Sequence, residues 1–127
     1  PDRLMTASVD GLACIYNTTG DLNEDDCMEG VLSVGVSIGR IGFYGPGGRN
    51  AWCLTHTEEL SLWEWESTTL LAQFKNTRQA ASDAANAALM SASAALGHQS
   101  GTPPLQVDYL IRCEYSAVLN QLYLLAG

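Results

Sequence analysis

Two stretches of the chain share one pattern: Ser8-Val9-Asp10-Gly11-Leu12-Ala13-Cys14-Ile15-Tyr16-Asn17 and Thr55-His56-Thr57-Glu58-Glu59-Leu60-Ser61-Leu62-Trp63-Glu64. Equivalent residues lie 47 positions apart throughout. Each stretch follows a short apolar segment and contains a tight polar turn and then a strand that ends in an aromatic and a polar residue. The two stretches therefore predict two copies of one antiparallel hairpin, over residues 3–8 with 12–17 and 50–55 with 59–66.

The spacing of the two hairpins indicates a fold class. A period in the forties with four short strands per unit is typical of a β-propeller blade. We therefore expect an all-β fold of consecutive four-stranded antiparallel blades, with about two and a half blades in this chain. Repeats of this kind usually build binding scaffolds rather than catalysts.

The repeat divides the rest of the chain into four parts. Residues 1–34 are expected to supply the last three strands of one blade, and residues 35–75 a complete blade. Residues 76–104 form an Ala-rich insertion, and residues 105–127 supply the first two strands of a third blade. The chain starts with Pro1 and stops inside an expected strand, so we expect a part of a longer protein that self-associates or stays partly unfolded when isolated.

The Ala-rich insertion differs in composition from the segments around it. Alanine fills nine of the 26 positions from 76 to 101, and alanine favours helix. Thr77 or Asp83 could cap a helix start. The large apolar residues are too few for a strong docking stripe: Leu89, Met90 and Leu96. We expect a loop insertion that is partly helical at best, with a mobile end rich in Ser, Gln and Gly.

The hairpins resemble those of WD-repeat propellers. That family's hairpin carries a small hydroxyl residue, an Asp-Gly turn, alternating apolar residues and then Trp-Asp. The first stretch matches with Tyr16-Asn17 in place of Trp-Asp, and the second matches except that Thr57-Glu58 replaces Asp-Gly. Residues 38–58 are also similar to the WD repeat protein 89 group, so the resemblance covers most of the chain.

The resemblance implies structural roles for eight residues: Ser8, Asp10, Gly11, Tyr16, Asn17, Thr55, Trp63 and Glu64. Tyr16 and Trp63 are expected to be mostly buried, with their polar atoms near Ser8 and Thr55. No Gly-His dipeptide precedes either hairpin, so the family's buried His–Ser–Trp–Asp network cannot be complete here. The implied function is a non-catalytic scaffold that binds other proteins.

The charge of the chain disfavours two classes of partner. The net charge is −8 and Lys plus Arg number only 6, whereas phosphate binding rests on clustered Lys and Arg. Nucleic acid and anionic membrane surfaces are therefore not expected. A small-molecule substrate and a cofactor are not expected either, because the sequence shows no catalytic constellation and no phosphate-binding glycine loop. The cysteines are widely spaced, and buried reduced thiols would favour an intracellular protein: Cys14, Cys27, Cys53 and Cys113.

An acidic segment is the one candidate for a metal. Asp21, Asn23 and Asp25 have the first spacings of a calcium loop, but Asp26 stands where glycine is needed and Leu32 where the bidentate glutamate belongs. A solvated loop is the simplest interpretation. The alternative is a contact for a basic partner, made by five residues: Asp21, Glu24, Asp25, Asp26 and Glu29.

Other functions remain open from the sequence. A propeller-type enzyme or sugar-binding module would need polar side chains at a channel mouth, where Asp108 and Arg112 are candidates, and an exposed Trp65 beside a carboxylate would favour it. Trp52 and Trp63 are expected in blade packing instead, and His56 has no ligand partner except His98. A third interpretation is a small independent β-domain with a helical insert.

Overall fold

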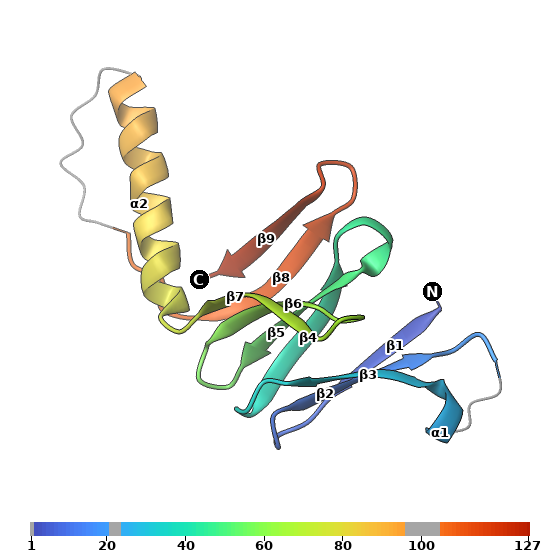
Figure 1. The fold of residues 1–127 in the computed structure, drawn as a ribbon. Coiled ribbons are helices and arrows are strands. Elements are labelled where there is room, and N and C mark those ends of the chain that lie inside the picture. Colours follow the sequence, from blue (N-terminus) through green and yellow to red (C-terminus); the bar gives the residue numbers. More distant parts are fainter. Residues whose placement is uncertain (1, 21–23, 96–104) are drawn as a thin grey trace.

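A computed structural model describes residues 2–20, 24–95 and 105–127 (Figure 1). The described strands form three antiparallel sheets, which we name in chain order. Sheet A consists of β1 (Arg3–Ala7), β2 (Leu12–Asn17) and β3 (Met28–Ser33). Sheet B consists of β4 (Ile38–Tyr44), β5 (Asn50–Thr55), β6 (Leu60–Glu64) and β7 (Thr69–Phe74). Sheet C consists of β8 (Leu110–Ser116) and β9 (Gln121–Ala126).

Within the described residues, three helical segments accompany the sheets: α1 (Glu24–Cys27), the 3-10 turn η1 (Pro46–Gly48) and α2 (Thr77–Ala95). The all-β class with a helical insertion is confirmed. The extent of the helix was underestimated, because α2 runs without a break over 19 residues where partial helix was expected. Alanine's low cost in a helix explains this continuity. The Ser, Gln and Gly end predicted to be mobile, residues 96–104, lies outside the described residues. No described helix is long and apolar enough to cross a membrane.

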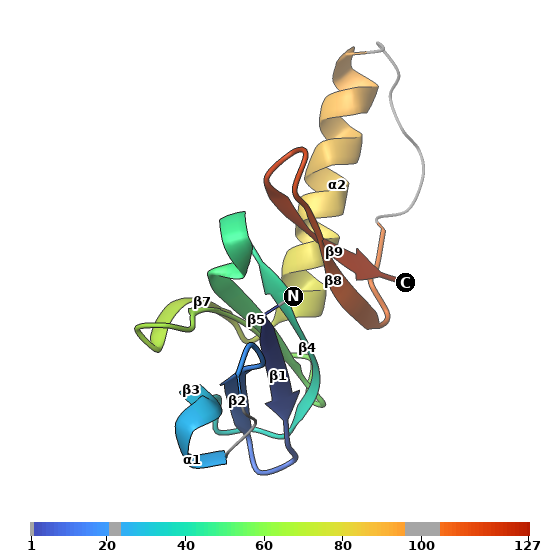
Figure 2. The ribbon, with the colours of Figure 1, turned by 90° about the vertical axis from the view of Figure 1, so that its right-hand side faces the viewer.

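Sheet B lies between the other two sheets and packs on both of its faces (Figures 1 and 2). Side chains of a strand alternate between faces, and in β5 both sets are buried. Ala51 and Cys53 join the core shared with sheet A, whereas Trp52 and Leu54 join the core shared with sheet C. This two-sided burial is what a blade between two neighbouring blades requires.

The predicted repeat is present in the strand register. Cross-strand pairs in β1–β2 run from Arg3 with Asn17 to Ala7 with Ala13. The pairs in β5–β6 run from Asn50 with Glu64 to Leu54 with Leu60, so every pair is shifted by 47 positions. The next ladder of each sheet, β2–β3 in sheet A and β6–β7 in sheet B, contains one register shift. The shift follows Ile15 in sheet A and Leu62 in sheet B, and these residues are again 47 positions apart. The predicted pairing of both hairpins is confirmed.

A second repeat links sheets B and C, and the sequence predicted its strands but not its register. The β4–β5 pairs run from Ile38 with Thr55 to Tyr44 with Asn50. The β8–β9 pairs follow the same order, from Leu110 with Ala126 to Ser116 with Gln121. Both hairpins shift register immediately after their first pair. Sheet C therefore has the geometry of the first two strands of sheet B.

Two of the four cysteines have thiols whose ionisation is disfavoured by burial. All four are free, with Cys14 half-buried and the others buried. Burial raises the pKa of Cys53 from 9.0 to about 12 and that of Cys113 to about 11. These thiols are therefore neutral packing groups rather than nucleophiles.

The raised thiol pKa predicts a loss of stability at alkaline pH. Above pH 9 the unfolded chain releases protons that the folded chain retains, so the thiol contribution is complete below pH 9 and declines as pH rises toward 12. We expect the denaturant midpoint to fall between pH 9 and 11, and to fall less steeply in Cys53→Ala. Equal slopes for the two proteins would contradict this.

Candidate functional site

The connections between strands gather at two ends of the stacked sheets (Figure 1). Because neighbouring strands are antiparallel, successive connections alternate between the ends. The helix end carries the turns at 8–11, 34–37 and 56–59 together with α2. The acidic end carries α1, η1 and the turns at 65–68 and 117–120. These ends are the candidate binding surfaces, because loops rather than packed strands usually carry function.

The two repeat hairpins turn at the helix end with the same backbone bonds. The Ser8 amide donates to the carbonyl of Leu12 at 3.0 Å, and the Gly11 amide donates to the carbonyl of Ser8 at 3.2 Å. Both bonds recur 47 positions later around Thr55, each at 3.0 Å. The Asp10 side chain accepts from the Leu12 amide at 3.0 Å, so it closes the first turn.

Glu58 explains how the second hairpin forms this turn without glycine. Gly11 has a φ of 85°, and a Cβ there would lie 2.8 Å from the nitrogen of Val36. Glu58, at the equivalent position, has a φ of 61°, which costs roughly 1–2 kcal/mol for an L-residue. Its carboxylate forms an ion pair with Arg78 at 2.7 Å and accepts from the Leu110 amide at 3.1 Å. Glu58 thus ties sheet B to α2 and to sheet C.

Helix α2 is docked through polar side chains. The Thr77 hydroxyl accepts from a β6 amide at 3.2 Å, and the Ser82 hydroxyl accepts from the Val107 amide at 2.9 Å. Asn86 forms two bonds with the backbone of Leu105, at 2.9 and 2.7 Å. Ser82 and Asn86 are one turn apart and so share a helix face. The few large apolar residues of the helix do not provide a docking stripe, since Leu89 and Met90 are exposed.

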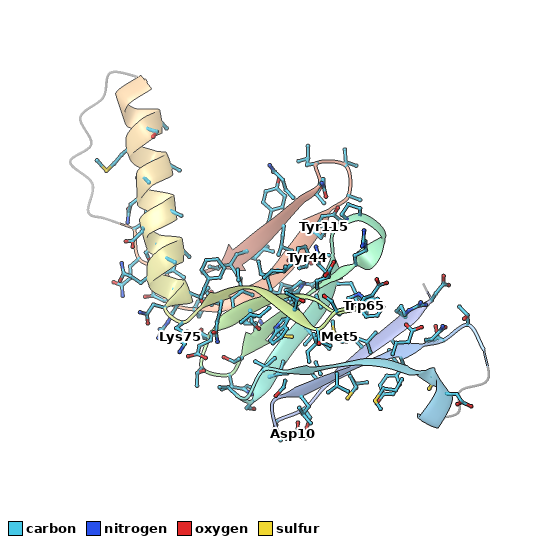
Figure 3. The ribbon with its side chains drawn as sticks, in the orientation of Figure 1. Met5, Asp10, Tyr44, Trp65, Lys75 and Tyr115 are labelled. Atoms are coloured by element: carbon cyan, nitrogen blue, oxygen red, sulfur yellow. The ribbon has the colours of Figure 1, made fainter. Side chains whose placement is uncertain are left out.

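A polar pocket of about 1010 Å³ lies beside this docked half of α2. It is lined by the second hairpin turn, the start of α2 and residues 105–107. Charged and polar side chains face it, and several already bind each other: Arg78 forms an ion pair with Glu58, and the Gln79 amide donates to Asp83 at 2.9 Å. Lys75, the single lysine of the chain, also lines the pocket and lies next to the start of α2 (Figure 3). The pocket can receive polar groups of a partner.

Replacement of Glu58 tests this junction. We expect Glu58→Ala to lower the free energy of unfolding by about 1–3 kcal/mol, because two bonds are lost while the strained φ remains. Glu58→Gly should cost less, since glycine adopts a positive φ readily. Denaturant unfolding of both variants gives the comparison, and a glycine variant less stable than the alanine variant would contradict the role assigned to φ.

At the acidic end, Glu29 contacts other residues of sheet A. Its carboxylate forms an ion pair with Arg3 and accepts from the Asn17 side chain at 3.1 Å. Of the other predicted contact residues, Asp26 is exposed, whereas Asp21 and the side chains of Glu24 and Asp25 lie outside what the structure describes. Within the described residues, no group of three His, Cys, Asp or Glu residues could hold a metal ion.

The positions predicted for Trp63 and Tyr16 need correction. Both are half-buried rather than mostly buried. The Trp63 indole donates to Ser61 at 2.9 Å and not to Thr55, whose hydroxyl instead accepts from the Glu59 amide at 3.0 Å. Ser61 lies two residues before Trp63 on the same strand face, so its buried hydroxyl is the nearer acceptor.

The remaining repeat positions lie at strand ends. Glu64 accepts from the Ser67 hydroxyl at 2.6 Å, and the Asn17 side chain also accepts from the Thr19 amide at 2.9 Å. His56 is exposed and bonds Ser37 at 2.7 Å. Both residues of that bond belong to turns at the helix end.

Trp65 is the buried aromatic residue whose role the sequence did not reveal. Only 5% of its surface is exposed, and its indole donates to the Gly48 carbonyl at 2.8 Å. The Phe43 ring meets it edge-on at 6.4 Å, and the Arg3 guanidinium lies 5.9 Å from its ring centre. Figure 3 places Trp65 between sheets A and B, near Met5. Its burial is contrary to what a sugar-stacking site would need.

Asp108 and Arg112 do not converge on a site with Trp65. The backbone carbonyl of Asp108 accepts from Arg78 at 3.0 Å, and Arg112 forms an ion pair with Glu114. Arg112 belongs to β8 of sheet C and Asp108 lies two residues before that strand, whereas Trp65 lies between sheets A and B. The candidates for a channel-mouth site are therefore separate in the structure.

Two curated proteins similar to this chain are named as WD-repeat proteins. WD repeat-containing protein GTS1 of Arabidopsis thaliana is 52% identical over 83 residues, which are 65% of this chain and 21% of that protein. WD repeat-containing protein 89 homolog of Dictyostelium discoideum is 28% identical over 127 residues, which are 99% of this chain and 30% of that protein. These two relatives support a WD-repeat family for this chain. It spans less than a third of the length of either WD-repeat relative.

Two further comparisons gave no match. No family model matches the chain, and no solved structure matches it significantly. The WD-repeat assignment therefore rests on the two relatives, together with the repeated strand register described above.

Proposed function

We propose that this WD-repeat chain is part of a propeller that acts as an intracellular protein-interaction scaffold without chemistry of its own. Sheet A supplies the last three strands of one blade, sheet B a complete blade, and sheet C the first two strands of a third. The α2 insertion separates the second and third blades. Four free cysteines support an intracellular location, since reducing compartments preserve thiols.

The observation that carries this proposal is the shared register of the sheets. Five cross-strand pairs of the first hairpin recur 47 positions later, and the first hairpin of sheet B recurs in sheet C. Repeats in register place equivalent turns at one end of the stack. Such an array presents many loops to a partner while the packed strands supply rigidity.

The acidic end offers one candidate contact. Asp26 is exposed on α1, and the chain as a whole carries a net charge of −8. Complementary charge speeds the encounter of two proteins and favours a basic partner. We propose that this contact is formed by Asp21, Glu24, Asp25 and Asp26. Glu29 instead stabilises sheet A through its bonds with Arg3 and Asn17.

Site-specific photo-crosslinking in the full-length protein tests the scaffold function. A photoreactive residue replaces Asp26 at the acidic end, Met90 on α2, or Val118 in the β8–β9 turn. We expect discrete protein adducts at position 26, reduced at high salt because exposed charges are screened. Val118, which is 95% exposed in another turn of the acidic end, is the control that shows whether the adducts are specific to α1. Adducts equal at all three positions, or none at any, would contradict the proposal.

A further inference from the structure

One contact between sheets involves residues that recur at equivalent positions. Arg40 follows the bulge of β4, and its guanidinium donates to the backbone carbonyl of Ile111 in β8. Strands β4 and β8 lie side by side (Figure 1). Arg112 follows the bulge of β8 in the same register. An arginine therefore stands at the same point of the first strands of two successive sheets.

The apolar face that receives sheet C is also repeated on sheet C. Trp52 and Leu54 form that face on sheet B, are 5% and 4% exposed, and pack with residues of β8. Their counterparts in the register of β9 are Tyr123 and Leu125. These two are 44% and 40% exposed in the structure. Sheet C thus presents an aromatic ring, a leucine and an arginine in the arrangement by which sheet B binds sheet C.

We propose that Arg112 is a positioning residue that seats a following sheet of the same repeat type on sheet C. The Arg112 guanidinium would donate to a backbone carbonyl at the bulge of that sheet's first strand, in the same way as the Arg40 guanidinium donates to the carbonyl of Ile111. Tyr123 and Leu125 supply the apolar part of the contact. The inference rests on the proposed function, because it requires a further blade beyond sheet C, and it continues the interface between sheets B and C.

Glu114 is the present partner of Arg112 and does not prevent this contact. The two side chains form an ion pair and are each about half exposed, so the pair is weak. The position equivalent to Glu114 in β4 is Gly42, which has no side chain to compete for Arg40. A guanidinium has five N–H donors, so Arg112 can keep Glu114 and still donate to a carbonyl.

Hydrogen exchange on the full-length protein tests the role of Arg112. We expect Arg112→Gln to raise exchange in residues 121–125 by roughly threefold to tenfold, the range that one hydrogen bond provides. Arg40→Gln should have the same effect on residues 110–113. Arg112→Lys, which keeps an N–H donor, should restore most of the protection. Arg49→Gln is the matched control, because Arg49 is exposed and its contact with Glu64 is 4.0 Å long.

The outcomes separate this inference from the proposed function. Exchange of residues 121–125 that is slow in the wild type and faster in Arg112→Gln, but not in Arg49→Gln, supports both the role of Arg112 and the proposed blade order. Slow exchange that Arg112→Gln leaves unchanged would overturn the role of Arg112 but not the blade order. Solvent-accessible Tyr123 and Leu125 in the wild type would overturn both, because no sheet would then cover sheet C.

Discussion

Replacing Trp65 by alanine is expected to lower the free energy of unfolding by about 3–5 kcal/mol, the range for a large buried aromatic residue. Trp65 fills the space between sheets A and B, and its indole donates to the Gly48 carbonyl. The substitution removes the edge-on contact with Phe43 and leaves that carbonyl without its donor. Denaturant unfolding of the full-length protein measures the loss.

Trp63→Ala is the matched control for this prediction. The two tryptophans are two positions apart in the sequence, but Trp63 is half-buried and donates to a side chain of its own strand. Its loss should therefore cost clearly less than the loss of Trp65. If Trp63→Ala proved the more destabilising of the two, the packing assigned to the boundary between sheets A and B would be wrong.

The second large effect is expected at the other boundary of sheet B. Trp52→Ala should also cost about 3–5 kcal/mol, because Trp52 is 5% exposed and packs with Leu110 and Cys113 of sheet C. The substitution should also open access to the Cys113 thiol, which is 2% exposed. The rate at which a thiol-modifying reagent labels Cys113 under native conditions measures this access.

Val118→Ala provides the reference for the Trp52 experiment. Val118 is 95% exposed in the β8–β9 turn, on the same sheet as Cys113. Its removal should change neither the stability nor the modification rate of Cys113. A Trp52→Ala protein that keeps Cys113 protected and its unfolding midpoint unchanged would show that sheets B and C do not pack as described.

The hairpins could be predicted because their pattern is local. A turn residue, alternating side chains and a fixed offset of 47 positions determine strand pairing without reference to distant contacts. The strands of sheet C were expected from composition, but the register that sheet C shares with sheet B was not, because α2 separates the two copies and their residues differ, as Gly42 and Glu114 do. These hairpins share a bulge, a register and only a few residue types, such as Arg40 and Arg112, and so few matches do not reveal a repeat in the sequence.

The candidate site was harder to predict because its contacts join distant segments. Glu58 reads as a departure from an Asp-Gly turn, yet its carboxylate binds Arg78 and the amide of Leu110. Likewise, Ser82 and Asn86 look like ordinary polar residues of an Ala-rich helix until residues 105–107 lie beside them. Polar contacts of this kind depend on the placement of whole elements, which local periodicity does not specify.

An experimental structure of the full-length protein tests the central claim most directly. The account predicts that sheets A, B and C are consecutive blades of one ring, with β4 and β8 as neighbouring strands at its inner side and further sheets covering Leu4 of sheet A and Tyr123 of sheet C. Direct packing of sheet A against sheet C, which would close these residues into an independent domain, would contradict it.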